Sequence, residues 1–308
     1  MHRLFLLFVL FVALWFSGCS RQQEASSDPI YMAQINAWHL QRVETLTRPD
    51  GWLTLAGLFW LQEGENRIGS DPGNDILLPA GKAPKRLGSF FLTSGRVHVA
   101  IAPRVKVKNQ DSVLVTHQEM ITDAAGTPSR LTCGTLTFFI IKRGDRFGVR
   151  LRDREHENRL HFKGIRRYPV TDTWRVPASY VPYEPVKKIK VTNVVGAVTE
   201  QDCPGTLAFS IDGKNYQLDV LSEGEKEPFF VIIADETSGE ETYGGGRFLY
   251  VERPDSTGRT FIDFNKAFNP PCAFTPYATC PLPPAQNRLP IAVTAGEKRY
   301  EGPSTHES

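Results

Sequence analysis

The stretch DFNKAFNPPCAFTPYATCPLPPAQNRLPIAVTAGEK, residues 263–298, is rich in proline and holds two cysteines, Cys272 and Cys280. Proline has no backbone N–H to donate and clashes with the preceding helical turn, so the stretch is neither a helix nor a central strand. Aromatic residues such as Phe268 and Tyr277 punctuate it, which is not typical of a disordered linker. It predicts a long, stiff, ordered loop, and ordered loops of this length are often functional.

The composition is that of an ordinary globular protein. The 308 residues suffice for one large domain or two smaller ones. The net charge is only +2, without the excess of positive charge that nucleic-acid-binding proteins typically have, so we predict no nucleic-acid partner. Proline at 22, glycine at 25 and phenylalanine at 19 favour many short strands and turns over long helices.

Residues 1–19 have the features of a signal peptide. A basic start precedes an unbroken apolar run over residues 4–16, which is too short to span a bilayer comfortably and suits a secretory signal. Ser17-Gly18-Cys19 then resembles a bacterial lipobox, although Phe16 departs from the usual leucine. The alternatives are an ordinary secreted protein and an N-terminal anchor helix. We predict that Cys19 is lipidated and that the chain contacts the membrane through this lipid.

Residues 20–29 form a polar tether that contains no core residues. By resemblance to Gram-negative lipoproteins, Ser20 after the cysteine favours the outer membrane. The predicted location is therefore the cell envelope, lipid-anchored, and the outer membrane facing the periplasm if the source is Gram-negative.

The remaining chain predicts one helix followed by strands. Residues 30–47 have apolar residues at helical spacing, with Asp28 as a cap. We expect strands at 52–61, 97–107, 112–117, 135–142, 146–151, 189–198, 206–211, 215–221, 229–234, 247–253, 259–264 and 290–294. The fold class is all-β: an antiparallel sandwich or barrel with an N-terminal helix and the proline-rich loop. We assign 30–300 to a single domain, with room for a sub-boundary near 125–130, and 301–308 to a polar tail.

Four cysteines remain after Cys19, an even number in an exported protein. We predict a disulfide between Cys272 and Cys280, because the loop between them is short and stiff. The pairing of Cys133 and Cys203 stays open. A metal clip needs more ligands than this segment offers, so we predict no metal site, while a nucleophilic thiolate stays an alternative. The sequence identifies no cofactor.

Two arginines, Arg150 and Arg152, alternate along one strand and share a face. If that face is concave, they can hold a carboxylate or phosphate through bidentate hydrogen bonds. The alternative is a solvated turn between strands, since charges of both signs follow.

A candidate site lies around the start of the proline-rich loop. Asp263 and Asn265 share a strand face, and Arg247 begins the preceding strand, which in an antiparallel hairpin lies near them. The predicted pocket consists of Tyr243, Arg247, Asp263, Asn265 and Asn287. The alternative is a buried hydrogen-bond network that holds the loop. Asp235 ends a buried strand and is a further candidate, with a turn-forming role as its alternative.

Several phrases, GWLTLAGLFWL, FKGIRRYPV, DETSGEETYGGGRFL and the proline-rich stretch, resemble the bacterial domain-of-unknown-function family 1684 over roughly residues 35–300. The resemblance implies a single family-wide domain that contains the loop, and it brings no activity or catalytic residue. Our functional prediction is an envelope lipoprotein that binds a small ligand or an envelope partner through a pocket beside the loop. The alternative is a periplasmic hydrolase or metal-assisted enzyme that uses Asp235 and Asp263. Whether the protein is an enzyme stays open.

Overall fold

The computed structural model describes residues 28–302, so the predicted signal peptide, Cys19 and most of the tether lie outside the described residues. The predicted helix is confirmed as α1 (Pro29–Thr47). Asp28 caps it by accepting a hydrogen bond from the Ile30 N–H at 2.9 Å, and Pro29 occupies the first turn, where no N–H is needed. None of the helices within 28–302 is long and apolar enough to cross a membrane.

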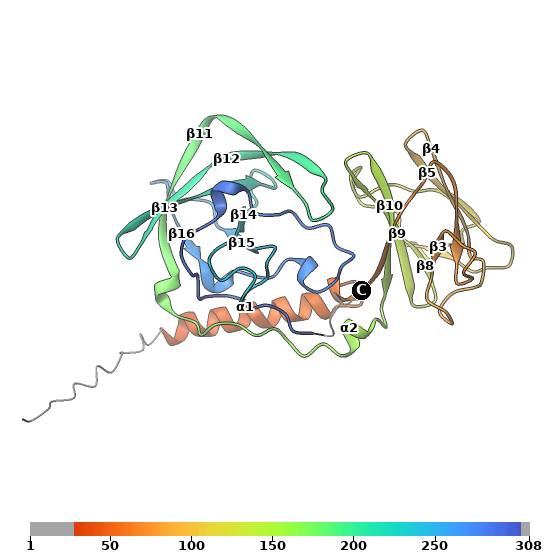
Figure 1. Cartoon of the computed structure of the whole chain (residues 1–308), viewed down its shortest axis with the longest axis horizontal. Helices are drawn as coiled ribbons and strands as arrows, with labels where there is room; N and C mark the ends of the chain where they lie inside the picture. Colours follow the sequence, from red (N-terminus) through yellow and green to blue (C-terminus); the bar gives the residue numbers. More distant parts are fainter. Residues whose placement is uncertain (1–27, 303–308) are drawn as a thin grey trace, which may run out of the picture.

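The strands form two lobes, which stand side by side in Figure 1. The first lobe comprises residues 55–153 and holds two five-stranded sheets over one shared core. Phe90 and Phe138, one from each sheet, meet edge to face with ring centroids 6.0 Å apart. One sheet has the order β1 (Leu55–Trp60), β10 (Arg146–Asp153), β9 (Leu136–Arg143), β8 (Leu131–Cys133) and β6 (Lys108–Asn109). The other has the order β3 (Ile76–Leu77), β2 (Gly64–Gly69), β4 (Gly88–Thr93), β5 (Arg96–Ile101) and β7 (His117–Glu119).

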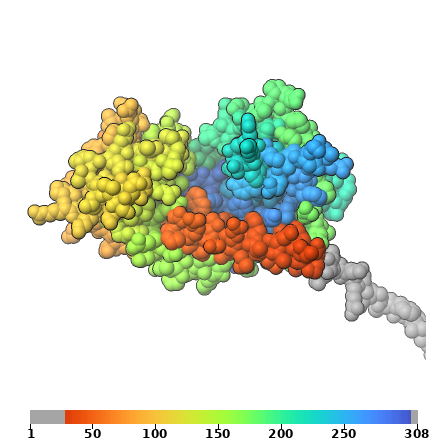
Figure 2. Space-filling view, turned by 180° about the vertical axis from the view of Figure 1, so that it is seen from behind, coloured from red at the N-terminus to blue at the C-terminus, as the bar shows by residue number. Residues whose placement is uncertain are grey.

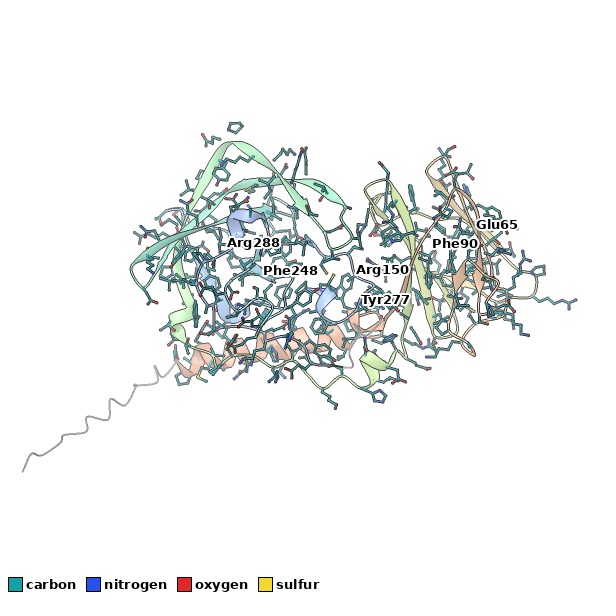
Figure 3. The ribbon with its side chains drawn as sticks, in the orientation of Figure 1. Glu65, Phe90, Arg150, Phe248, Tyr277 and Arg288 are labelled. Carbon is teal, nitrogen blue, oxygen red and sulfur yellow. The ribbon has the colours of Figure 1, made fainter. Side chains whose placement is uncertain are left out.

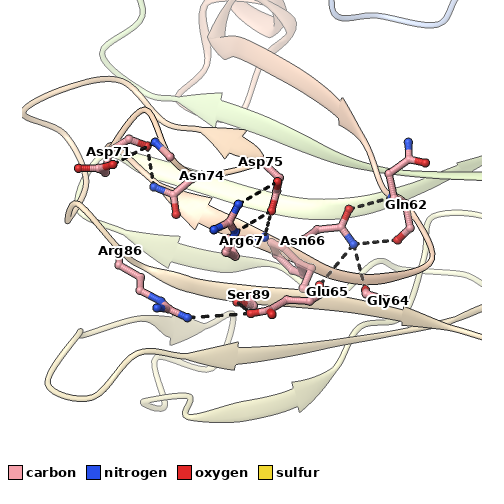
Figure 4. A network of polar contacts seen from close by, with 12 residues as sticks. Gln62, Gly64, Glu65, Asn66, Arg67, Asp71, Asn74, Asp75, Arg86 and Ser89 are labelled. Carbon is pink, nitrogen blue, oxygen red and sulfur yellow. Dashed lines mark hydrogen bonds and ion pairs between the residues drawn. The ribbon is translucent and has the colours of Figure 1, made fainter.

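Polar contacts fix the edge of this second sheet (Figure 4). Arg67 pairs with Asp75 at 3.2 Å across the turn that joins β2 to β3, and β2 and β3 run parallel. The Asn66 carboxamide accepts from the Gln62 N–H at 2.8 Å. These contacts shape the turns on either side of β2.

The second lobe comprises α1 and residues 160–302. Its six-stranded antiparallel sheet has the order β15 (Arg247–Val251), β14 (Phe229–Ile233), β13 (Lys214–Ser222), β12 (Val198–Ile211), β11 (Arg175–Thr192) and β16 (Arg259–Asp263). The predicted strands at 206–211, 215–221 and 229–234 are confirmed, and the first two pair as an antiparallel hairpin. Short helices complete the fold: α2 (Glu157–Leu160), η1 (Trp52–Thr54) and η2 (Asp172–Trp174).

Two expectations about this sheet are wrong. Strands β15 and β16 do not form a hairpin; they occupy opposite edges, because the long strand β11 pairs with β16 instead. The two edges still approach each other. Thr260 Oγ1, in β16, donates to the carbonyl of Glu252, the residue after β15, at 2.9 Å. The sheet is therefore curved toward a half-barrel. Residues 290–294 form no strand.

The proline-rich stretch is an ordered loop packed within the second lobe, as predicted. Single turns of 3₁₀ helix punctuate it: η3 (Phe264–Lys266), η4 (Pro271–Ala273) and η5 (Ala285–Asn287). Phe264 and Phe274 are fully buried, so aromatic side chains anchor the loop to the cores on either side. The fold is therefore the predicted antiparallel all-β class with an N-terminal helix.

Candidate functional site

A cavity of about 360 Å³ lies where the two lobes and α1 meet. The space-filling view of Figure 2 shows α1 lying across the second lobe toward the first, with a recess between the lobes above it. The lining side chains come from both lobes, α1 and the proline-rich loop: Arg42, Trp52, Arg143, Arg150, Gln201, Glu223, Phe230, Phe248, Tyr250, Phe268, Pro271, Thr279, Cys280 and Pro281.

Arg150 is the most deeply placed cation of this cavity. It projects from β10 at the junction of the lobes (Figure 3) and is only 3% exposed. One Nη donates to Thr279 Oγ1 at 3.2 Å, while Nε has no hydrogen-bond partner. Within residues 28–302 no carboxylate forms an ion pair with it. Burial, and then the neighbouring Arg143, lower the pKa of Arg150 to about 10, so the guanidinium is still charged at neutral pH.

Two further arginines face the same space, and each has an acidic partner. Arg143 donates from Nε to Thr279 Oγ1 at 2.9 Å and pairs with Asp123 at 2.8 Å. Arg42 reaches in from α1 and contacts the buried Glu297 at 3.4 Å. Thr279 therefore receives hydrogen bonds from both first-lobe arginines, which ties the loop to β9 and β10.

Aromatic rings form the opposite wall. Phe230 and Phe248 meet edge to face at 4.9 Å, and Tyr250 stacks on Phe268 at 6.0 Å. The Arg42 guanidinium lies 4.7 Å from the centre of the Phe268 ring, within cation–π range. Tyr250 is 47% exposed at the mouth. Burial of its ring and then the nearby Glu223 raise the pKa of Tyr250 to about 12, so its hydroxyl is neutral at physiological pH.

Cys280 lines the cavity, and Cys272 lies next to it. Each backbone N–H donates to the sulfur of the other residue, at 3.1 Å to Cys280 Sγ and at 3.2 Å to Cys272 Sγ. The predicted disulfide is not formed in the structure, where both are free thiols, as are Cys133 and Cys203. The hydrogen bond from Cys280 lowers the pKa of Cys272, whereas burial raises the pKa of Cys280.

Asp235 and Arg247 form an ion pair at 2.8 Å, with both side chains fully buried. Arg247 also donates to the Val293 carbonyl at 3.0 Å and to the Ala295 carbonyl, so it holds the end of the proline-rich stretch. The expectation that Arg247 lies near Asp263 rested on a hairpin that does not exist. Its partner is Asp235, at the end of the adjacent strand β14.

Asp263 and Asn265 lie together, as predicted, and dock α1. Tyr31 donates its hydroxyl hydrogen to Asp263 Oδ1 at 2.7 Å, and Asn265 Nδ2 donates to the Tyr31 oxygen at 3.0 Å. Asn265 also bonds the Thr171 carbonyl at 2.9 Å. Burial of the Tyr31 ring, followed by the Asp263 hydrogen bond, raises the pKa of Tyr31, so this contact keeps its donor at neutral pH.

Asn287 and Tyr243 lie elsewhere. The Asn287 side chain holds the backbone of Asp219 through two hydrogen bonds. Its Oδ1 accepts from the Asp219 N–H at 2.8 Å, and its Nδ2 donates to the Asp219 carbonyl at 2.9 Å. Tyr243 packs in the cluster that contains Cys272, and burial raises the pKa of Tyr243 to about 12. The six predicted residues thus fall into four groups, and none of them lines the cavity. Their contacts are those of the structural alternative, and ligand binding by them stays a prediction.

Of the cavity residues, the sequence pointed to Arg150, through strand alternation, and to Cys280, as one half of the predicted disulfide. Arg42, Arg143 and Thr279 were missed, because only tertiary folding brings the helix, β9 and the loop together. The described residues contain no group of three or more His, Cys, Asp or Glu side chains that could hold a metal ion.

A larger groove of about 920 Å³ lies over β11 to β13, and polar and apolar surface line it in similar amounts. Its central carboxylate, Asp219, accepts from the Tyr183 hydroxyl at 2.8 Å and from Gln286 Nε2 at 2.9 Å. Asp219 is therefore already paired, and the cations of the groove, Lys187 and Arg288, are exposed, so among the described residues the groove offers no buried cation comparable to Arg150. The junction cavity is therefore the stronger candidate.

Comparison with known proteins supports the family resemblance, over a shorter range than the predicted 35–300. The family model described as "Protein of unknown function (DUF1684)" matches residues 160–298, which include the proline-rich stretch and both of its cysteines. A solution NMR structure of an uncharacterized protein of Haloarcula marismortui is 32% identical, with 46% of this chain and 78% of that one covered and a TM-score of 0.39. No curated protein matches the chain. On this evidence the chain belongs to the DUF1684 family of proteins of unknown function.

Proposed function

We propose that this protein is an envelope lipoprotein that binds a small amphiphilic anion in the junction cavity, beside the proline-rich loop. The observation that carries the proposal is Arg150, a buried guanidinium whose Nε is unpaired and which has no carboxylate partner among the residues that the structure describes. A buried charge without a partner is costly, and an anionic ligand offsets that cost.

The charges of the lining favour an anion. Arg42, Arg143 and Arg150 are cationic, and Glu223 is the acidic residue of the lining. A planar guanidinium matches carboxylate and phosphate oxygens and holds them by two parallel hydrogen bonds. The anionic group is expected to lie against Arg150.

The remainder of the ligand is expected to be apolar and flat. Trp52, Phe230, Phe248, Tyr250 and Phe268 supply ring faces and edges in the same cavity. The proline-rich wall is rigid before a ligand arrives, so little ordering entropy is lost on binding. Aryl phosphates and aryl carboxylates combine both requirements.

The hydrolase alternative has less support. The Asp235 side chain is fully buried, and its oxygens accept from Thr237, Arg247 and Val293, which leaves no room for a substrate. Asp263 is engaged with Tyr31 at the end of α1. A binding role is the better account of the geometry.

Phenyl phosphate tests the proposal, with phenol as the uncharged control. We expect calorimetric titration to show binding of phenyl phosphate and none of phenol. Arg150→Leu should weaken binding by about 30-fold or more, because removal of a buried charge partner costs about 2 kcal/mol or more. Arg146→Leu is the matched control, since Arg146 lies on the same strand but is exposed over Trp60.

Thermal unfolding of both variants verifies that the fold is retained. Equal affinity of the Arg150→Leu and Arg146→Leu proteins for phenyl phosphate contradicts the proposal, as does binding of phenol as tight as that of its phosphate.

The lipid anchor is tested separately. The apolar run over residues 4–16 and Ser17-Gly18-Cys19 support lipidation at Cys19. Cys19→Ala should move the protein from the detergent phase to the aqueous phase on phase separation, because a lipid-modified cysteine supplies the membrane affinity. Ser20→Ala is the control and should stay in the detergent phase. If the Cys19→Ala protein stays in the detergent phase, and its mass differs from that of the parent only by the substitution, the assignment is wrong.

A further inference from the structure

The two thiols of the proline-rich loop are arranged as a ligand pair. Cys272 and Cys280 are 5% and 6% exposed, and each accepts a hydrogen bond from the backbone N–H of the other. We propose that Cys272 and Cys280 form a two-coordinate site for a soft monovalent cation, Cu(I), which needs two ligands only; this proposal revises the prediction of no metal site.

The donor set selects the metal class. Thiolates are soft ligands that favour Cu(I), whereas structural zinc takes four ligands. No cluster of three or more His, Cys, Asp or Glu side chains exists within the described chain, so the pair lacks the further ligands that zinc needs. A filled-shell Cu(I) ion is satisfied by two thiolates in a linear arrangement.

The binding step balances in charge and in protons. A Cu(I) ion bound by both sulfurs forms two Cu–S bonds, and each thiol that becomes a ligand releases its proton to solvent. The occupied site carries a single negative charge, and Arg150 lines the same cavity as Cys280.

The surroundings are already organised for metal binding. The backbone N–H groups that donate to the sulfurs act as outer-shell partners, which orient ligands and stabilise their charge. Pro271 and Pro281 flank the two cysteines and restrict the backbone. Cys280 lines the junction cavity, which gives an ion a route to the pair.

The other two described cysteines provide matched controls. Cys133 lies on β8 in the first lobe, whereas Cys203 is buried on β12 in the second. Cys203 Sγ contacts the Gly205 carbonyl rather than another sulfur. Neither belongs to a pair, so neither should hold Cu(I) at the affinity of a two-thiolate site.

The test is an anaerobic titration of the reduced protein with Cu(I), supplied as its acetonitrile complex. Native mass spectrometry counts the copper ions bound per chain. The affinity is measured by adding acetonitrile, which competes for Cu(I), while the thiolate-to-copper absorption band in the ultraviolet reports how much copper stays bound. We expect one Cu(I) per chain, bound more tightly as the pH rises because thiols release protons when they bind a metal ion. Cys272→Ser and Cys280→Ser should each weaken binding by at least about 100-fold, in line with loss of one of two ligands. Cys133→Ser and Cys203→Ser should bind as the parent does.

Failure of the reduced parent protein to bind Cu(I) overturns the proposal, and so does equal binding by the Cys272→Ser protein. A disulfide that resists reduction by phosphine in the folded protein overturns it too. The phenyl phosphate assay is independent: a Cys272→Ser protein that loses copper but still binds phenyl phosphate separates this inference from the proposed function.

Discussion

Replacement of Asp235 by alanine should destabilise the protein by roughly 3–5 kcal/mol, because it leaves the Arg247 guanidinium buried without its counter-charge. Both side chains of this pair are fully buried at 2.8 Å separation. Arg247 cannot turn to solvent, since it also holds the Val293 and Ala295 carbonyls. Denaturant unfolding of the parent and variant measures the loss directly.

The exposed pair Arg67–Asp75 supplies the control. Its side chains are 50% and 47% exposed, so Asp75→Ala should leave the unfolding midpoint nearly unchanged. If Asp235→Ala lowers the free energy of unfolding by no more than Asp75→Ala does, the buried pair does not stabilise the fold as described.

The Asp235 variants also separate a structural from a catalytic role. Asp235→Asn keeps the size of the side chain and can still accept one hydrogen bond from Arg247, so part of the protein should stay folded. That folded fraction should bind phenyl phosphate with the parent affinity, because Asp235 does not line the cavity. Lost affinity with unchanged stability would instead place Asp235 in the site.

Local sequence signals predicted much of the fold. α1 was evident from helical periodicity and a capping aspartate, and the pairs β9–β10 and β12–β13 from alternating strands with tight turns between them. The pairing of β15 with β16 was wrong because sequence proximity suggested a hairpin. The true partner of β16 is β11, which contains prolines and reads poorly as a strand.

The site was less predictable, for the same reason. Alternation along β10 indicated that Arg150 and Arg152 share a face, and the structure puts both 5.8 Å from the Trp52 ring. Nothing local connects Arg42 on α1 with Thr279 in the loop. Asp235 and Arg247 were selected because they are charged residues at the ends of apolar strands. The structure shows that both side chains are fully buried and pair with each other, which is a structural role.

The glycine triplet before β15 gives a second large effect. Gly246 adopts φ +85, in the left-handed region that glycine favours, and a Cβ there would lie 2.5 Å from the Ile233 carbonyl oxygen. The same Cβ would lie 2.4 Å from Cγ of Pro283 in the proline-rich loop. The absent side chain therefore lets the loop pack against the strand ends beside the buried ion pair.

Gly246→Ala should destabilise the protein by about 3 kcal/mol, since left-handed strain costs about 1–2 kcal/mol and overpacking about 1–3 kcal/mol. Gly244→Ala is the matched control, because the nearest atom to its added Cβ, Gly239 Cα, is at an ordinary 3.5 Å. Denaturant unfolding should show a change within about 0.5 kcal/mol for that variant. Equal losses for the two variants would mean that the loop does not press on Gly246. The cavity wall that this loop forms would then owe its rigidity to the prolines alone.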